Sequence, residues 1–509
     1  QIKAQYGGAE GTRLREFNVG MFGGQDFERG NISFFLDYTD RTALRAEDQD
    51  FTASDNLRSF FANDPDFASS LTPDGRNTRG AWANLAVVGG PGVIRQGTVA
   101  LTSAAGALRV QPTSIAGCAA NVGAGICIGA GALNFNTVQR DLRFDTAPGT
   151  TINPETQRFN LMVTGDYEIN ENVSAFGELG WYQASTLRIQ PPVINLNTLT
   201  IPASNYWNPF GPVTFANGQA NPNRLPGLTN VPVGGLPLTL NQYRFVDAGF
   251  QNVEVENYQA RILGGLKGNF RGFDWESALV YTEAKAEDVS DAVNSTALQR
   301  QLALSTPDAY NPFNGGCLNQ LSYGDCTPSS QAAIDAIKFK LVRESRTTLT
   351  MGDLKVSKPD LFKIWGGDVG IAFGVEVRGE TQRDNRDANL DGTNPFVDSV
   401  TGARQLSNVI AVSQNPDTRG KRTVSSVYVE LALPIVSEEM NIPLVQSFDM
   451  QLAARAENYS DFGGVAKPKV AVAWGIFDGL KLRGSYSEGF RAPNLEQTNT
   501  ATYGRLATN

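Results

Sequence analysis

The clearest regularity in this chain is a strict alternation of apolar and polar residues over short stretches. In FDMQLAARAE, residues 448–457, every second residue is apolar, while Asp449, Gln451, Arg455 and Glu457 lie between them. Successive side chains of a β-strand point to opposite faces, so this period of two predicts a strand with one apolar and one polar face. The same pattern recurs at residues 32–38, 161–167, 275–281, 369–380, 427–433 and 480–486. Amphipathic helical patterns are nearly absent, and the best short candidates are 64–71 and 329–341.

About twelve strands are predicted, arranged as hairpins, and their connections are of two kinds. Short connections lie at 169–172, 271–274 and 477–479. Long connections, rich in Asn, Gly, Pro and Ser, lie at 47–136, 190–242, 289–341 and 386–419. Short turns at one end and long loops at the other are typical of an outer-membrane β-barrel, whereas soluble sandwiches have loops of mixed length at both ends. The fold class predicted is therefore all-β, a transmembrane antiparallel barrel with long extracellular loops.

The two faces of the predicted strands have different expected surroundings. In a barrel, alternate residues line a wet lumen, and we expect this of Glu376, Arg378, Asp449, Arg455, Glu457 and Arg483. In a soluble sandwich the same residues would face solvent. Aromatic residues near strand ends are candidates for the girdles at the two membrane surfaces, with ordinary packing in a β-core as the alternative: Tyr38, Trp181, Tyr182, Trp275, Tyr281, Tyr459 and Trp474.

Composition and charge exclude several functions. The formal net charge of the 509 residues is -9, which argues against a nucleic-acid partner because such partners favour basic surfaces. The chain contains no histidine, so it has no Ser-His-Asp triad, no Cys-His pair and no histidine-ligated zinc site. No catalytic constellation is visible, and we expect neither an enzyme nor a required cofactor. The lack of histidine also disfavours haem as a ligand.

The four cysteines fall into two pairs with the same spacing. Cys118 and Cys127 enclose one Gly-rich segment, and Cys317 and Cys326 enclose another. Both pairs lie inside predicted long loops, and neither is a CxxC motif of the kind that binds zinc. Two small disulfide-closed loops, and hence an oxidising compartment, are predicted, with four unrelated free thiols as the alternative.

One segment has the ligand spacing of a calcium loop. Oxygen-bearing residues stand at the first, third, fifth and twelfth positions of the segment, and Gly392 occupies the sixth: Asp387, Asn389, Asp391 and Asp398. This order matches a calcium-binding loop, although the twelfth residue is Asp rather than the longer Glu and no helices flank it. A Ca²⁺ ion in an outer loop is one interpretation, and an Asx/Gly-rich turn is the other.

Aromatic residues of the long loops are candidates for ligand contact. They could stack on sugars or catecholates, yet their NPFG and NPFN settings also suit packing anchors within the loops: Tyr206, Trp207, Phe210, Tyr310 and Phe313.

Several motifs along the chain together resemble one family. SYSEGFRAPNLEQ, residues 485–497, closely resembles a motif of TonB-dependent outer-membrane receptors, in which a strand ends in an FRAP-like turn. Upstream, the YSDFG of 459–463 resembles an outer turn of the same family. Further similar stretches are ERGNISFFLDYTDR, LGGLKGNFRGFDWESALVY, YNPFNGGC, GGDVGIAFGVEVRGE and VSSVYVELALPIV.

The resemblance implies a fold, partners and a location. It implies that residues 1–509 are part of a barrel of 22 strands, of which about twelve are expected here, and that the N-terminal plug domain is not within them. It further implies the outer membrane of a Gram-negative bacterium, contact with its lipid, and contact with the TonB complex through the plug.

The resemblance also implies a function. We expect a receptor that binds a scarce extracellular nutrient of the siderophore, oligosaccharide or peptide class and imports it with energy transmitted by TonB. The alternative is a passive porin or a β-rich surface adhesin.

Overall fold

A single large antiparallel sheet forms most of the molecule. The computed structural model describes residues 1–67, 70–90, 92–196, 199–315 and 327–500. Within them, thirteen strands pair in the order β1-β2-β3-β12-β13-β17-β18-β19-β20-β23-β24-β25-β26. Their bounds are β1 Ile2–Gly8, β2 Arg15–Phe27, β3 Gly30–Arg41, β12 Glu155–Asn170, β13 Val173–Gln190, β17 Gln251–Phe270, β18 Phe273–Val293, β19 Lys338–Ile364, β20 Gly367–Arg386, β23 Thr418–Val436, β24 Ser447–Tyr459, β25 Gly463–Phe477 and β26 Leu480–Ser487.

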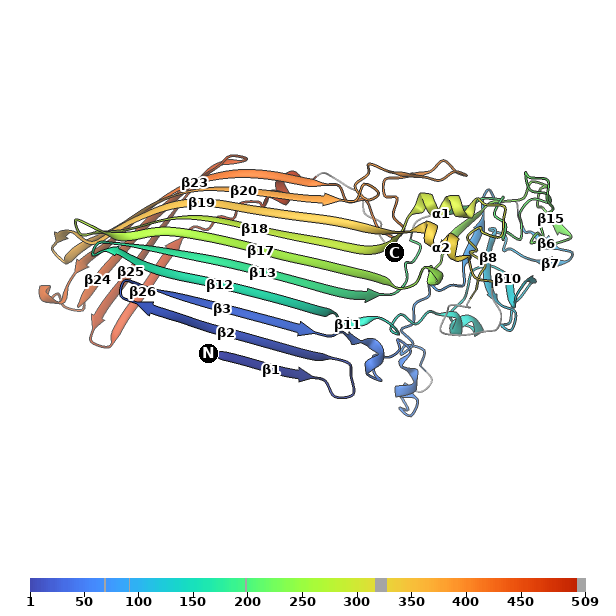
Figure 1. The fold of residues 1–509 in the computed structure, drawn as a ribbon, viewed down its shortest axis with the longest axis horizontal. Helices are drawn as coiled ribbons and strands as arrows, with labels where there is room; N and C mark the ends of the chain where they lie inside the picture. Colours follow the sequence, from blue (N-terminus) through green and yellow to red (C-terminus); the bar gives the residue numbers. More distant parts are fainter. Residues whose placement is uncertain (68–69, 91, 197–198, 316–326, 501–509) are drawn as a thin grey trace.

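The strands follow one another as a meander, as the alternating pattern predicted. Each pairs with its sequence neighbours in the sheet, and β1 and β26 each have one partner among the described residues, so the sheet is not closed. The connections at 171–172, 271–272 and 478–479 are tight turns, whereas those at 42–154, 191–250, 294–337 and 387–417 are long. Figure 1 shows these long loops gathered at one end of the strands, which confirms the predicted asymmetry.

The two faces of the large sheet differ in chemistry. On β20, Val375 and Val377 are exposed on one face, and Glu376 and Arg378 lie on the other. The first face, here called the apolar face, also carries exposed apolar side chains from neighbouring strands: Leu179, Ile262, Leu279, Leu354, Val427, Val429, Val470 and Leu482. The second, the polar face, carries the predicted lumen-lining residues. A row of exposed apolar side chains is what a strand in contact with lipid requires.

The hydrophobic core lies outside the large sheet, in the long loops. Its main cluster of 31 buried residues runs from Trp82 to Ile410 and draws on all four long loops, while Val293 at the end of β18 is its one member from the large sheet. A six-stranded sheet, β14-β16-β5-β8-β10-β9, forms its framework. We call this packed unit the loop cap. Figure 1 shows it beyond the ends of the long strands.

Short elements complete the loop cap and the chain end. The small strands are β4 Leu44–Arg45, β5 Asn84–Val87, β6 Arg95–Gln96, β7 Val99–Ala100, β8 Ala107–Pro112, β9 Ala120–Gly123, β10 Ile126–Ala130, β11 Thr151–Asn153, β14 Leu199–Ile201, β15 Leu228–Thr229, β16 Leu238–Gln242, β21 Phe396–Val397 and β22 Arg404–Gln405. The α-helices are α1 Ser295–Leu302, α2 Gln331–Ile337 and α3 Leu495–Asn499. Single turns of 3₁₀ helix lie at Ala46–Asp48, Leu57–Phe61, Val138–Leu142, Val246–Ala248 and Glu438–Met440.

Of the two predicted helical segments, one is confirmed. Helix α2 forms within 329–341, with the Ser330 hydroxyl accepting a hydrogen bond from the Ala333 amide as its N-cap. In 64–71, residues 65–67 form a turn instead. None of the helices in the described ranges has the length and hydropathy that crossing a membrane would need.

One predicted disulfide is present in the loop cap. Cys118 and Cys127 are bonded and join the segment before β9 to β10. Cys317 and Cys326 lie outside the described residues. The bonded pair confirms the interpretation of the first cysteine-enclosed segment as a disulfide-closed loop.

Candidate functional site

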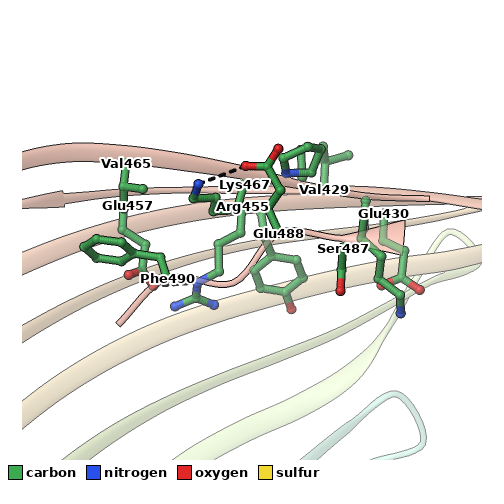
Figure 2. A pocket seen from close by; sticks show the side chains of 14 residues that line it. Val429, Glu430, Arg455, Glu457, Val465, Lys467, Ser487, Glu488 and Phe490 are labelled. Carbon is green, nitrogen blue, oxygen red and sulfur yellow. Dashed lines mark hydrogen bonds and ion pairs between the residues drawn. The ribbon is translucent and has the colours of Figure 1, made fainter. Parts of the chain in front are cut away.

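A groove on the polar face gathers charged side chains from β23, β24 and β25 and from Glu488, which directly follows β26. Its volume is about 460 Å³, and Figure 2 shows its lining. The polar groups on it are Tyr428, Glu430, Arg455, Glu457, Lys467, Lys469, Ser487 and Glu488, with Phe490 at one end. We call it the polar groove. The register explains the gathering, because Tyr428 lies opposite Arg455 and Arg455 opposite Lys467 on successive strands.

Ion pairs connect four of the six predicted lumen-lining residues. Arg378 donates to Glu376 at 2.7 Å and to Glu380 at 2.8 Å. Arg455 donates to Glu457 at 2.7 Å, and its second nitrogen lies 3.7 Å from Glu376. The charges therefore form one alternating network across β20 and β24 rather than isolated groups. Such a network presents both donors and acceptors to a polar ligand.

The other two predicted lumen-lining residues lie further from the loop cap. Asp449 and Arg483 line a second hollow of the same face, about 670 Å³ in volume, together with Asp368 and Lys469. Lys481 lies 3.9 Å from Asp449. Lys469 lines both hollows, so the polar face offers a continuous charged path along β25.

A cluster of rings and one arginine joins the two motifs that resemble the receptor family. Arg422 of β23 donates to the Asp461 carboxylate at 2.7 Å and to the carbonyl oxygen of Pro493 at 2.8 Å. Its guanidinium lies 5.5 Å from the ring centres of Tyr459 and Phe462. These two rings stack at 4.3 Å, and Phe490 contacts both. The YSDFG turn and the FRAP segment are thus held together, which we call the arginine clip.

The clip directs the chain that follows β26 across the polar face. Helix α3 packs on β23, and Leu495 and Asn499 occupy the space beside Gly420 where a Cβ would stand. The resemblance of SYSEGFRAPNLEQ to the receptor motif implied that a strand ends in a turn here. The chain does leave the sheet there, and α3 then lies over the polar side of the strands. Tyr459, a predicted girdle residue, is 5 % exposed within the clip, which corrects that assignment.

Burial separates the five loop aromatics. Phe210 and Tyr310 have no exposed surface and Phe313 has 3 %, because all three pack in the core of the loop cap. They are packing anchors, as their NPFG and NPFN settings also suggested, and cannot stack on a ligand from outside. Tyr206 and Trp207 are half-buried, with ring centres 4.9 Å apart. Only these two stay available as ligand-loop candidates.

Three of the four predicted calcium ligands accept hydrogen bonds from backbone amides, and the side-chain oxygen of the fourth, Asn389, accepts from the side-chain amides of Asn294 and Asn408. Asp387 accepts from the Asn389 amide at 2.8 Å, and Asp391 accepts from the Thr393 amide at 2.7 Å. Asp398 is buried and accepts from the amides of Thr200 at 3.0 Å and Val400 at 2.9 Å. No group of three or more acidic or sulfur ligands was found within the described ranges. The calcium loop stays a prediction.

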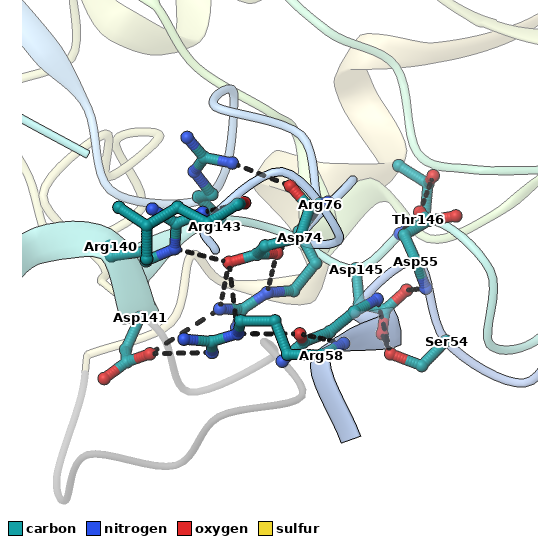
Figure 3. A network of polar contacts seen from close by, with 12 residues as sticks. Ser54, Asp55, Arg58, Asp74, Arg76, Arg140, Asp141, Arg143, Asp145 and Thr146 are labelled. Atoms are coloured by element: carbon teal, nitrogen blue, oxygen red, sulfur yellow. Dashed lines mark hydrogen bonds and ion pairs between the residues drawn. The ribbon is translucent and has the colours of Figure 1, made fainter. Parts of the chain in front are cut away.

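Two buried polar networks stiffen the loop cap, and one is centred on Asp74. Figure 3 shows Arg76 and Arg140 donating to its carboxylate, each at 2.9 Å, with Arg58 and Arg143 beside them. Burial alone would raise the pKa of Asp74, but the bonds from Arg76 and Arg140 outweigh it and hold the pKa at about 2. The carboxylate ties 3₁₀ turn Val138–Leu142 to the loop before β5.

The second network joins two long loops through a buried carboxylate. Asp247 accepts from the Tyr310 hydroxyl at 2.6 Å and from the Asn314 amide at 3.0 Å. The Tyr243 hydroxyl lies 3.2 Å from that of Tyr310. Burial raises the pKa of Asp247 and, together with that carboxylate, raises the pKa of both tyrosines. These groups are buried and link the loops, so we assign them to structure.

Comparison with known proteins decides the family. The family model described as TonB dependent receptor-like, beta-barrel matches residues 203–509. This chain belongs to the TonB-dependent receptor family. The match covers β17 to β26, the polar groove and the arginine clip of the receptor chain. No curated protein matched the receptor chain.

Solved structures similar to the receptor chain are also receptors and transporters. A mutant of the ferric enterobactin receptor PfeA from Pseudomonas aeruginosa has a TM-score of 0.41 and 9 % identity, covering 97 % of this chain and 44 % of its own. The RagAB peptide transporter has a TM-score of 0.40 and 8 % sequence identity, and the alignment covers 93 % of this chain and 36 % of the transporter chain. The siderophore receptor PirA from Acinetobacter baumannii has a TM-score of 0.38 and 10 % sequence identity, and the alignment covers 97 % of this chain and 42 % of PirA. The receptor chain spans less than half the length of these proteins.

Sequence reasoning missed several residues of the polar groove and the clip. Tyr428, Glu430 and Lys467 share the alternation of the predicted lumen residues, and pairing the strands in register would have found them. Arg422 gives no such indication, because its partners lie 39 and 71 residues further along the chain.

Proposed function

We propose that this chain forms a barrel wall of an outer-membrane receptor that binds a scarce extracellular nutrient and imports it past the polar face. The observation that carries the proposal is the charged network of the polar groove on one face of strands whose opposite face is apolar. Lipid on the apolar side and water on the polar side satisfy both faces. The energy comes from TonB, acting through a plug domain of the intact protein.

The polar groove suggests what kind of ligand passes. Arg455 and Lys467 offer cationic donors, Glu430, Glu457 and Glu488 offer acceptors, and Phe490 offers an exposed ring. A siderophore, a peptide or an oligosaccharide carries groups that match such a mixed surface. Enterobactin is the ligand bound in one PfeA complex, and peptides are the substrate named for RagAB.

Uptake assays test the proposal. A strain lacking the gene is compared with wild type for uptake of labelled ferric siderophores, peptides and oligosaccharides, with and without functional TonB. We expect that uptake of one of these three ligand classes is lost both in the deletion strain and in the TonB-deficient strain. Uptake that persists without TonB would indicate a passive porin, and surface attachment without uptake would indicate an adhesin.

A pair of variants then tests the polar groove. Arg455→Ala should reduce ligand uptake about tenfold or more, because a charge-assisted hydrogen bond contributes roughly 1.5–3 kcal/mol. Arg404→Ala removes the same charge from β22 of the loop cap, where the side chain is exposed. Equal uptake by both variants would remove the groove from the proposed pathway.

A further inference from the structure

A row of four basic side chains crosses four adjacent strands on the apolar face, near the loop cap. The register places Lys285 opposite Arg346, Arg346 opposite Arg383, and Arg383 opposite Arg419. Lys421 follows two residues after Arg419 on the same face of β23. We call these five residues the basic band. Like charges directly opposite each other destabilise a sheet, so this row needs compensating anions.

The chain itself compensates only one end of the basic band. Lys285 lies 2.9 Å from the Glu344 carboxylate, and Arg346 lies 2.8 Å from that of Glu283. Arg383 donates to the neutral amide oxygen of Asn385 at 3.3 Å. Within the described part of the chain, Arg383, Arg419 and Lys421 form no ion pair with a carboxylate, and all three are exposed.

A hollow lies where these uncompensated charges meet. Its volume is about 690 Å³, and no carboxylate lines it. Four cations of the basic band line it together with the hydroxyls of Thr348 and Thr381, which lie 2.5 Å apart. Guanidinium, ammonium and hydroxyl donors around one space are the chemistry that holds a phosphate group.

The position along the strands indicates which kind of phosphate. On β23 the exposed residues of this face run from Val429 and Val427 to Lys421 and Arg419 as the strand approaches the loop cap. On β20 they run from Val377 to Arg383. On both strands the cations stand beyond the exposed apolar stretch on the side of the loop cap. Two small or polar residues of the same face lie between: Thr423 and Ser425 on β23, and Gly379 and Thr381 on β20.

Aromatic side chains of the same face support this position. Trp181 and Tyr281, two predicted girdle residues, are 41 % and 40 % exposed, and Trp181 stacks on Tyr258 at 5.7 Å. Tyr258 lies opposite Lys285 in the row of the basic band. Aromatic girdles lie at the level of lipid headgroups, so the band lies at the membrane surface.

We propose that the basic band binds the phosphate of a membrane lipid headgroup. The proposal rests on the proposed function only for the membrane location of the sheet. A nutrient passing the polar face would not meet these side chains, because they project from the opposite face. Cations that stand beyond an apolar span, at the level of the membrane surface, attract anionic lipid by electrostatics that add up over the side chains.

Lipid titration tests the proposal. Fluorescent phosphatidylglycerol is titrated into the intact protein in neutral detergent, with phosphatidylcholine and inorganic phosphate as separate probes. We expect the triple variant R383Q/R419Q/K421Q to bind phosphatidylglycerol about a hundredfold more weakly than wild type. The matched control R95Q/R300Q/R404Q removes three exposed charges from the loop cap and should bind like wild type.

Any other outcome of the lipid titration would overturn the proposal. Equal binding by the triple variant, or equal affinity of wild type for phosphatidylcholine, would exclude the basic band as a headgroup site. Full competition by inorganic phosphate would assign the band to free phosphate instead. Nutrient uptake by the triple variant should equal that of wild type. Recovery of the protein outside the membrane fraction would refute the proposed function separately, whatever the lipid titration gives.

Discussion

The large sheet and the loop cap are built on opposite principles. Protein covers little of either face of the sheet: Val375 and Val377 are exposed on one face, and Glu376 and Arg378 are half-buried within their ion pairs on the other. The loop cap instead encloses a core, in which Phe210 and Tyr243 have no exposed surface. The sheet therefore depends on its surroundings for stability, whereas the cap is stabilised by its own buried apolar area.

This difference has a consequence for function. A binding surface that rests on a rigid enclosed core keeps its shape without ligand. A barrel wall with a charged face instead lets a polar ligand move along it and forms no fixed pocket. Tyr206 and Trp207 belong to the first kind of surface, and Arg455 and Lys467 belong to the second. The following changes would break or sharpen the contrast between the two regions, and they are ordered by expected effect.

The largest effect is expected in the core of the loop cap. Phe210→Ala should cost about 3–5 kcal/mol of cap stability, because it leaves a cavity in a fully enclosed site. Pulse proteolysis in urea measures the loss. Phe51→Ala, the same change at a residue that is 64 % exposed, should cost less than about 0.5 kcal/mol. Equal costs would mean that the cap has no specific core.

A charge on the apolar face comes next. Val375→Arg should cost about 2–4 kcal/mol of folding free energy in a lipid bilayer, because the side chain would enter hydrocarbon. Urea titration of protein refolded into vesicles measures it. Ala372→Arg places the same charge on the polar face of the same strand, where Glu430 lies opposite, and should be tolerated. If the two variants were equally stable, the assignment of the faces would fail.

The disulfide of the loop cap contributes less. Replacing both Cys118 and Cys127 by Ser should cost about 2–3 kcal/mol, since the bond closes a short loop with a sequence separation of 9. Proteolysis of the cap should accelerate, while refolding of the sheet into vesicles should be unchanged. A matching loss in both regions would show that the cap and the sheet unfold together.

Acid should weaken the loop cap through Asp74. Its pKa of about 2 lies below the ordinary 3.8, so ionised Asp74 stabilises the fold fully above about pH 4, and this stability is lost as the pH falls towards 2. The loss is about 2 kcal/mol. Cap stability measured across this range should lose most of its pH dependence in Asp74→Asn. The control variant Asp66→Asn, at an exposed position, should retain the pH dependence of cap stability.

The smallest effect is expected from calcium at the loop of Asp387 to Asp398. Extracellular modules bind calcium weakly, with dissociation constants of about 10⁻⁴–10⁻³ M, so any stabilisation is modest. Isothermal titration calorimetry should detect calcium binding to the wild type and none to Asp391→Ala. Equal heats for the two proteins would identify the segment as a turn and nothing more.

Alternation predicted the large sheet well because its cause is local. Each strand has a different environment on each of its two faces. The polarity of a residue such as Asp449 or Met450 therefore indicates its face, even when the neighbouring strands are unknown. The same logic placed Glu376, Arg378, Arg455 and Glu457 on one face. Spacing likewise indicated the Cys118–Cys127 bond, since its partners lie close in sequence.

The loop cap was not predictable in this way. Its strands, such as β14 and β16, are only 3 and 5 residues long, so any alternation in them is too short to stand out from the surrounding loop. Their core brings together residues as distant as Leu85 and Phe396, and no local pattern indicates that such residues meet. For the same reason Phe210 and Tyr310 were candidates for ligand contact from their loop settings, while their burial was decided by the folded cap.

By itself, the sequence determined the class of the protein. Period-two alternation, one-sided loop lengths and the SYSEGFRAP motif are short-range features, and they led to a barrel wall of the receptor family. Tertiary structure decided which residues act together. It joined Asp461 and Pro493 through Arg422, and it aligned Arg346, Arg383 and Arg419 across three strands. Register and loop packing set these contacts, and both depend on partners far away in the chain.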